Sequence, residues 1–269
     1  MEPLLAFIGG GNMASAIIGG LVAAGRSGGS ILVVEPFEAQ RERMRNEHGV
    51  ATIATADASL AEAALVVWAV KPQLFKEAAA PAGAHIGQAL QLSVMAGIRS
   101  RAIAAAAGTE RVVRAMPNTP ALIGRGIAGL FARPAVTAQE RSLVEQVLAP
   151  TGQTLWVARE SDLDAVTALS GSGPAYVFYF VEAMMQAAAE LGLPAEQGRQ
   201  LALATFAGAT ELARRSSDPP ELLRERVTSK GGTTYAALTT LEAAGVKAAF
   251  IDALKAARRR AEELGDEFG

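Results

Sequence analysis

A glycine-rich turn between an apolar strand and an apolar-periodic helix constrains this chain most strongly. The apolar residues 4–8 lead directly into residues 9–14, G-G-G-N-M-A, which have the spacing G-x-G-x-x-A. Glycine permits the unusual φ of a tight turn and a close approach to a pyrophosphate, and the N–H groups that start the next helix attract the same anion. The motif therefore predicts a dinucleotide-binding site, with an ordinary strand-to-helix turn as the alternative.

Short apolar runs alternate with helical patterns over the first part of the chain. The alternation indicates an α/β fold with a parallel sheet covered by helices on both faces. A capping box formed by Thr137 and Glu140 predicts the start of one helix. The predicted strands are residues 4–8, 31–34, 65–70, 91–95, 111–115, 126–131 and 154–157. The other predicted helices are residues 13–24, 39–47, 59–62, 74–79 and 99–107.

Beyond about residue 160 the pattern is helical throughout. The turn Ser170–Pro174 precedes a stretch from Tyr176 to Met185 that is apolar almost all round. A helix without a polar face must be buried on every side, which predicts a subunit partner; a central core helix within one chain is the alternative. Four later helices are predicted. The first runs from Pro194 to about Arg215, and the second follows an N-cap at Asp218, with Glu221 completing a capping box. The third starts at Thr233 or Thr234, and the last contains Phe250 and Leu264.

These patterns predict a dinucleotide-binding Rossmann-type domain over residues 1–160 and an all-α domain over residues 161–269. The net charge of −2 without a basic stripe argues against nucleic acid as a partner, and no apolar run is long enough for a bilayer span. The chain has no cysteine and no signal-peptide pattern, which is compatible with a cytoplasmic location. Its two histidines, His48 and His85, lack further ligands at metal spacing, so no metal site is predicted.

Three polar features mark candidate binding sites. Glu35 ends the second strand, where a carboxylate accepts hydrogen bonds from the adenosine ribose of NAD. Arg41 and Arg43 are placed to reach the 2′-phosphate of NADP instead, so the choice between NAD and NADP stays open. Lys71 follows a strand at the ligand-binding edge of the sheet. Residues 228–234, T-S-K-G-G-T-T, form a candidate nest of N–H donors for a small carboxylate. No nucleophile–base–acid triad is evident, and hydride transfer from a nicotinamide needs none.

Five motifs taken together resemble the pyrroline-5-carboxylate reductase family. They are F-I-G-G-G-N-M-A at 7–14, A-V-K-P at 69–72, R-A-M-P-N-T-P at 114–120, A-L-S-G-S-G-P-A-Y-V-F at 168–178 and V-T-S-K-G-G-T-T at 227–234. The resemblance implies NAD(P)H-dependent reduction of 1-pyrroline-5-carboxylate to L-proline, the final step of proline biosynthesis. It also implies helices that interlock between two subunits, in homodimers that can assemble into a larger ring.

The resemblance also implies roles for individual residues. The backbone of Gly231, Gly232 and Thr233 would bind the substrate carboxylate, with Ser229 adding a hydroxyl and Thr234 hydrogen-bonding the ring nitrogen. The substrate site would also be lined by Ser170, Ser172 and Gly173. The residues implied to hold the cofactor are Gly9, Gly10, Gly11, Asn12, Met13, Ala14, Glu35, Ala69, Val70, Lys71, Pro72, Ala96, Gly97 and Asn118.

This sequence departs from the family pattern at Lys230, where many relatives carry proline, at Ala56, where many carry asparagine, and at Met95, where a smaller residue is common.

Two other functions compete with the one that the resemblance implies. A 3-hydroxyacid dehydrogenase would carry a catalytic lysine on the first helix of the second domain, but residues 175–191 contain none. A nucleotide-binding sensor without catalysis would not need Ser229 or Thr234. Related cyclic imines stay open as substrates.

Overall fold

The computed structural model describes residues 2–268, which divide into two compact units. The sheet unit comprises Met1–Pro174 and Ala256–Gly269, and the helical unit comprises Ala175–Lys255. This division falls after Pro174, whereas the sequence-based boundary was drawn after residue 160. Two long helices, α7 (Gly173–Glu190) and α11 (Val246–Phe268), contribute residues to both units.

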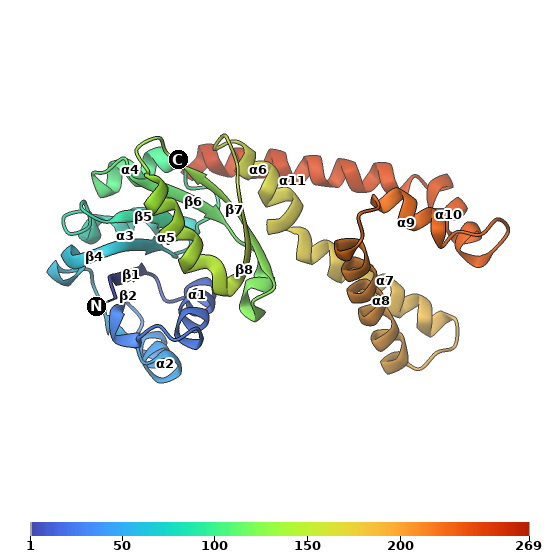
Figure 1. Cartoon of the computed structure of the whole chain (residues 1–269), viewed down its shortest axis with the longest axis horizontal. Helices are drawn as coiled ribbons and strands as arrows, with labels where there is room; N and C mark the ends of the chain where they lie inside the picture. Colours follow the sequence, from blue (N-terminus) through green and yellow to red (C-terminus); the bar gives the residue numbers. More distant parts are fainter. Residues whose placement is uncertain (1, 269) are drawn as a thin grey trace. The chain divides into compact units, whose positions relative to one another are not determined.

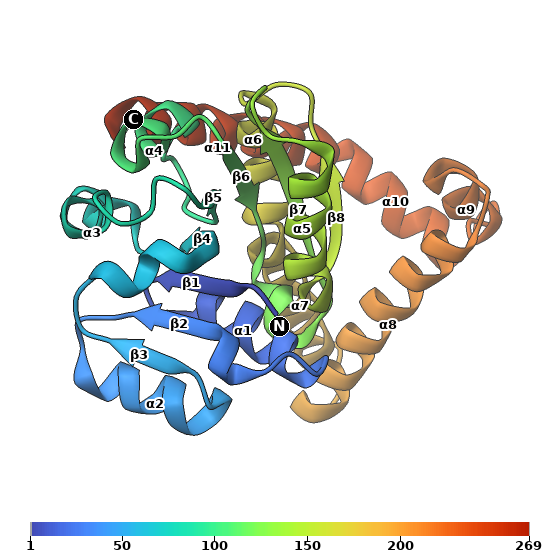
Figure 2. The same ribbon diagram turned by 60° about the vertical axis from the view of Figure 1, so that its left-hand side comes forward.

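The sheet unit is built on one eight-stranded sheet in the order β3-β2-β1-β4-β5-β6-β7-β8 (Figures 1 and 2). Every neighbouring pair is parallel except β6 and β7. The strands are β1 (Leu4–Ile8), β2 (Ile31–Val34), β3 (Ala51–Ile53), β4 (Ala63–Trp68), β5 (Leu90–Ser93), β6 (Val112–Met116), β7 (Gly126–Ala132) and β8 (Gly152–Trp156). The helices of this unit up to Pro174 are α1 (Asn12–Ala23), α2 (Glu38–His48), α3 (Phe75–Ala82), α4 (Ser100–Ala107), α5 (Ala138–Leu148) and α6 (Asp162–Val166).

Helices cover the sheet on both faces because successive side chains of a strand point to opposite sides. On β1, Leu5 and Phe7 belong to a core cluster that includes residues of α1, α2 and α5. The intervening Ala6 and Ile8 belong to a second cluster, which includes residues of α3 and α4. Both faces of β1 are therefore buried, as expected for a central strand of a parallel sheet.

The predicted strands at residues 4–8 and 31–34 are confirmed with their bounds, and the other five shift by one or two residues at their ends. The edge strand β3 was not predicted, and the predicted parallel sheet is confirmed for every neighbouring pair of strands except β6 and β7. Only a short 3₁₀ helix, Thr119–Ile123, lies between these two strands, and a connection that short cannot return the chain for parallel pairing.

The segment predicted as a turn at Ser170–Pro174 is helical instead. A π-helical segment, Thr167–Gly171, continues α6, and α7 begins at Gly173, so the path from Asp162 to Glu190 is nearly unbroken helix. π-Helical turns are rare in proteins and are often found at functional sites. The turn prediction was therefore wrong, while the helix start beside Pro174 is confirmed.

The remaining helices are α8 (Ala195–Arg215), α9 (Pro220–Arg226) and α10 (Thr233–Ala243). The N-cap of α9 is Pro219, so the predicted capping box of Asp218 and Glu221 is wrong. Asp218 instead forms an ion pair with Arg226 at the other end of α9.

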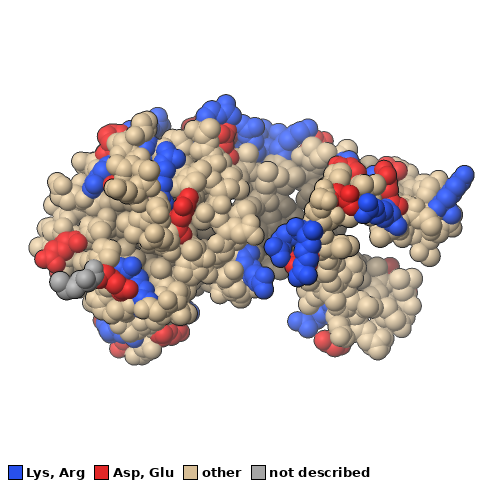
Figure 3. Space-filling view, viewed as in Figure 1, with Lys and Arg blue, Asp and Glu red and all other residues tan. Residues whose placement is uncertain are grey.

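Helix α7 leaves much of its apolar surface uncovered within the chain. Phe178 is 59% and Tyr179 69% exposed, and only Val181 and Ala188 on this helix are buried. A broad uncharged area lies over α7 and α8 (Figure 3). Because a surface of this kind is costly to leave in water, the alternative of a core helix within one chain does not hold. No helix in residues 2–268 is both long and apolar enough to cross a membrane.

The capping box of α5 is confirmed and gives a test of the fold. Thr137 Oγ1 accepts a hydrogen bond from the Glu140 N–H at 3.2 Å, and Glu140 Oε2 accepts one from the Thr137 N–H at 2.8 Å. Thr137→Ala should lower the free energy of unfolding by about 1 kcal/mol, measured by urea titration. Gln139→Ala, at an exposed position of the same helical turn, is the control; equal effects of the two variants would contradict a role for the cap.

Candidate functional site

The carboxyl ends of five parallel strands bring most of the predicted cofactor residues to one edge of the sheet. Gly9 N–H donates to the Val34 carbonyl at 2.8 Å, and Ala69 N–H donates to the Ile8 carbonyl at 2.9 Å. Val94 N–H continues the pattern by donating to the Trp68 carbonyl at 3.0 Å. The strand order reverses between β1 and β4, and ligands of open α/β sheets bind at such a switch point.

The glycine turn meets the two requirements that predicted it. Gly9 has a φ of +99°, and a Cβ there would lie 2.8 Å from the Ala69 carbonyl oxygen, so only glycine fits. Gly11 is the N-cap of α1 and has open space beside it, and no side chain caps the first N–H groups of the helix. Free N–H groups behind an open glycine face suit a pyrophosphate. The turn at residues 9–14 therefore fits the phosphates of a dinucleotide.

Glu35 is folded into this turn. Its carboxylate accepts hydrogen bonds from the Gly10 N–H and the Phe37 N–H, each at 3.0 Å, and the residue is 7% exposed. Arg41 donates to the carbonyls of Glu35 and Pro36 and pairs with Glu38. Glu35, predicted to bind the ribose, and Arg41, predicted to reach a 2′-phosphate, thus both form hydrogen bonds within the chain.

The other predicted cofactor residues differ in the contacts that they make within the chain. Lys71 is exposed at the end of β4, just before a 3₁₀ helix, Pro72–Leu74. Gly97 has a φ of +74°, and a Cβ there would lie 3.3 Å from the Leu264 carbonyl oxygen of α11. Asn118 Oδ1 accepts a hydrogen bond from the Ile127 N–H at 3.0 Å, which ties the loop after β6 to β7. Its oxygen therefore has a structural role.

The predicted carboxylate nest lies in the helical unit. Gly231 has a φ of +74°, Gly232 is the N-cap of α10, and no side chain caps this helix. Among the described residues, no hydrogen-bond partner is found for the hydroxyls of Ser229, Thr233 or Thr234. The loop therefore combines free N–H donors with free hydroxyls, as binding of a small anion requires.

The predicted substrate residues of the sheet unit lie on the π-helical segment and its end. Ser170 donates to the Val166 carbonyl at 3.2 Å, whereas the Ser172 hydroxyl has no partner among residues 2–268. A Cβ on Gly171 would lie 2.6 Å from Met116 Cε, so glycine lets the end of β6 pack on this segment. The loop after β6 and the S-G-S-G-P segment are therefore neighbours.

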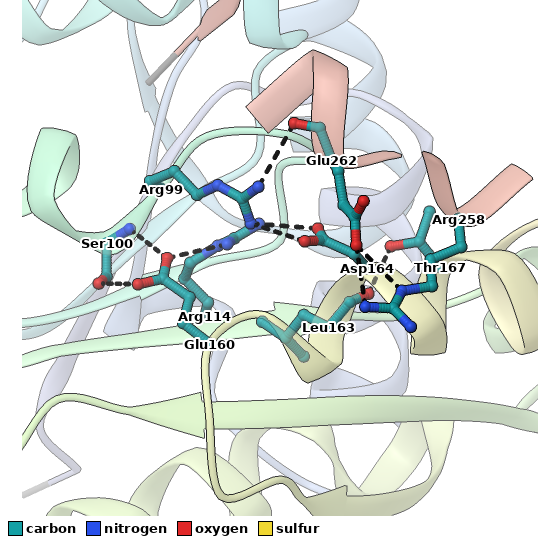
Figure 4. Close-up of polar contacts among 9 residues, drawn as sticks. All are labelled: Arg99, Ser100, Arg114, Glu160, Leu163, Asp164, Thr167, Arg258 and Glu262. Atoms are coloured by element: carbon teal, nitrogen blue, oxygen red, sulfur yellow. Dashed lines mark hydrogen bonds and ion pairs between the residues drawn. The ribbon is translucent and has the colours of Figure 1, made fainter. Parts of the chain in front are cut away.

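A partly buried network of ion pairs was not predicted from the sequence (Figure 4). Arg99 Nη1 donates to both carboxylate oxygens of Asp164, at 3.1 and 3.0 Å. Arg114 Nη1 donates to Glu160 Oε1 at 2.9 Å. The N–H and hydroxyl of Ser100 both donate to the Glu160 carboxylate at 2.6 Å. The network joins β6 and the start of α4 to the residues that begin α6.

Burial and polar contacts shift the pKa values of Arg114 and Glu160 in opposite directions. Burial lowers the pKa of the Arg114 guanidinium, while Glu160 beside it acts in the opposite direction. Burial raises the pKa of Glu160, but the hydrogen bonds from Ser100 and the ion pair with Arg114 outweigh it, so the pKa lies below its ordinary value of 4.5. Glu160 is therefore held as a carboxylate.

Comparison with known proteins matches this architecture in both parts of the chain. Residues 4–97 match the family model described as NADP oxidoreductase coenzyme F420-dependent, and residues 160–264 match the model for pyrroline-5-carboxylate reductase dimerisation. The chain is 42% identical to pyrroline-5-carboxylate reductase of Pseudomonas aeruginosa, over 99% of this chain and 98% of the relative. It is 39% identical to the Haemophilus influenzae enzyme of the same name, over 97% of both chains.

Solved structures agree over nearly the whole length. A pyrroline-5-carboxylate reductase from Coxiella burnetii superposes with a TM-score of 0.91 at 36% identity, over 98% of this chain and 99% of that one. The Plasmodium falciparum enzyme, solved with NADP bound, has a TM-score of 0.87 at 26% identity, over 98% of both chains. The chain belongs to the pyrroline-5-carboxylate reductase family.

The family match explains the uncovered surface of α7. This helix lies inside the region that matches the dimerisation model, so the predicted subunit partner is a second copy of the chain and the protein is a homo-oligomer. Family membership also decides against the 3-hydroxyacid dehydrogenase alternative. The matched region begins at Glu160, which is the residue that pairs with Arg114 in the partly buried network.

The lowered pKa of Glu160 predicts a change in stability at acid pH. A carboxyl whose pKa is depressed by folding stabilises the protein above its unfolded pKa, and this contribution is lost as the pH falls through the folded pKa. Glu160→Gln should lower the free energy of unfolding by about 1–2 kcal/mol near neutral pH, since the carboxylate is partly exposed. The gap between the two proteins should narrow as the pH falls below 4.5. A gap that stays constant through the acid range, in urea titrations, would contradict the assignment.

Proposed function

We propose that this protein reduces 1-pyrroline-5-carboxylate to L-proline with NAD(P)H, the final step of proline biosynthesis. The observation that carries the proposal is the full-length match to pyrroline-5-carboxylate reductases, at 42% identity over 99% of the chain. The open glycine turn and the uncapped nest before α10 add independent support from the residues.

The cofactor is proposed to lie along the carboxyl edge of β1, β2, β4, β5 and β6. The N–H groups at the start of α1 bind its pyrophosphate, with Gly11 giving the phosphates access. Ala69–Pro72 follow the adjacent strand β4 and are proposed to hold the cofactor, and Ala96–Gly97 are proposed to lie near its nicotinamide end. Glu35 and Arg41 border the ribose. The bound cofactor supplies a hydride from its nicotinamide ring.

The substrate is proposed to be held by its carboxylate. Gly231, Gly232 and Thr233 offer backbone N–H groups at the start of α10, which favours a negative charge. Ser229 adds a free hydroxyl, and the Thr234 hydroxyl hydrogen-bonds the ring nitrogen, which becomes an amine as the C=N carbon is reduced. Ser172 and Gly173, at the end of the π-helical segment, are proposed as further substrate contacts because they match the family motif.

We further propose that residues 161–269 act as the dimerisation and substrate-binding domain, and that dimers assemble into a larger ring. The exposed aromatic side chains of α7 support a large interface between copies. The cytoplasmic location expected from the sequence stays a prediction.

The test of the proposed function is the initial rate of NADPH and NADH oxidation by the purified protein with 1-pyrroline-5-carboxylate, together with detection of proline. Turnover with equimolar proline is the expected result, and the two rates give the cofactor preference. Cofactor binding without turnover of this imine would contradict the proposal and favour another cyclic imine or the sensor alternative.

The open space beside Gly11 predicts a variant that folds normally but binds cofactor poorly. Gly11→Ala adds a methyl group where no atom of the chain lies within 4 Å, at an extended backbone conformation that alanine adopts readily. The thermal midpoint of the free protein should therefore change little, while the Kd for NADPH or NADH rises at least tenfold because the methyl group faces the phosphates. Gly29→Ala, at an exposed position, is the control. Unchanged affinity for the cofactor would show that the phosphates do not bind at this face of the turn.

The free hydroxyl of Thr234 predicts a specific loss of activity. Thr234→Ala should lower kcat/KM on the order of tenfold to a hundredfold, because one polar contact to the substrate is removed. Thr240→Ala is the matched control, since its hydroxyl donates to the Ala236 carbonyl of the same helix at 3.0 Å. Steady-state kinetics in which both variants behave alike would exclude Thr234 from the mechanism.

A further inference from the structure

We propose that Arg99 is a positioning residue for hydride transfer, an inference that rests on the proposed function. Arg99 lies two residues after Gly97, at the end of the loop proposed to border the nicotinamide. Its guanidinium binds both oxygens of Asp164, which lies six residues before Ser170 on the helical path to the S-G-S-G-P segment. One side chain thus connects the cofactor loop to a segment proposed to line the substrate.

The connection is rigid on both sides. On the helix side, α6 and the π-helical segment join Asp164 to Ser170 without an intervening loop. On the loop side, Gly97 and Arg99 pack on the last turns of α11. A Cβ on Gly97 would lie 3.3 Å from the Leu264 carbonyl oxygen, and Arg99 Nη2 donates to the Glu262 carbonyl at 3.4 Å. The guanidinium therefore sets the spacing between the two segments (Figure 4).

The chemistry of the pair favours a geometric role. Arg99 Nη1 donates to both oxygens of Asp164 and Nη2 donates to the Glu262 carbonyl. One planar guanidinium thus holds two groups at fixed positions, which the single ammonium of a lysine does not do. Asp164 is 4% exposed, so water cannot substitute for the guanidinium without rearrangement. Hydride transfer depends steeply on the distance between donor and acceptor carbons, and misplacement by about 1 Å can cost a hundredfold in rate.

Two variants displace the guanidinium by different means. Arg99→Lys keeps the charge but removes the planar group whose two terminal nitrogens reach Asp164 and Glu262. Gly265→Ala keeps both charges, but its Cβ would clash with Arg99 Nη2, so the end of the flexible arginine must move. Arg159→Lys is the matched control, because Arg159 is adjacent to Glu160 in the chain and forms a solvent-exposed ion pair with Asp162. If Arg99→Lys does not fold, Gly265→Ala decides the question.

The experiment combines steady-state kinetics with a binding measurement. For both displaced variants, kcat should fall on the order of tenfold to a hundredfold while each KM stays within about threefold. The isotope effect on kcat with cofactor deuterated at the transferred position should rise, because hydride transfer becomes slower than product release. The fluorescence of the reduced nicotinamide in the binary complex should also change, with an unchanged Kd for the cofactor. Arg159→Lys should match the wild type in every measurement.

Each outcome decides between a positioning role and a merely structural one. Activity that falls only in proportion to the folded fraction, with the wild-type isotope effect and nicotinamide fluorescence, would overturn the proposal. If the wild-type protein binds cofactor but does not reduce 1-pyrroline-5-carboxylate, the proposed function fails, and the fluorescence comparison alone decides the role of Arg99. A changed fluorescence would support it in that case, and an unchanged one would refute it.

Discussion

Two partly buried ion pairs hold the start of the dimerisation segment against the sheet, and the arrangement of the candidate site depends on them. Arg99 with Asp164 and Arg114 with Glu160 each join a residue of the sheet domain to a residue 65 or 46 positions further along the chain. Burial makes such pairs costly to form, but removing one partner costs far more because the other charge is left without compensation. They therefore contribute little net stability and fix a specific geometry, in which the end of β5, the end of β6 and the π-helical segment are neighbours.

The reaction needs little from the protein beyond this geometry. The glycine turn and the free N–H groups of α1 are proposed to bind phosphates, and the uncapped start of α10 is proposed to bind a carboxylate. Both proposals use the same property of helix N-termini. The nicotinamide carries the redox chemistry, so the side chains have only to position the reactants and stabilise charge. This division explains why a chain without cysteine and with only two histidines can belong to a family of reductases.

Local sequence patterns predicted the parts of the structure that local physics determines. The apolar runs of β1 and β2 and the capping box at Thr137 were predicted with their bounds, and family motifs located the candidate site. The antiparallel direction of β7 follows from pairing between distant strands, and the three-residue β3 is too short to leave a pattern. The glycines of Ser170–Pro174 suggest a turn because no local rule anticipates a π-helix. The pairing of Arg99 with Asp164 has no sequence signal at all, since it depends on how the folded segments meet.

Transfer of a deuterium label tests the central claim most directly. In the proposed reaction, a hydride passes from the nicotinamide to the C=N carbon of 1-pyrroline-5-carboxylate within this protein. With cofactor deuterated at the transferred position, mass spectrometry and NMR of the product should find one deuterium on C5 of L-proline. Proline without deuterium, or no proline from a protein that binds the cofactor, would contradict the account.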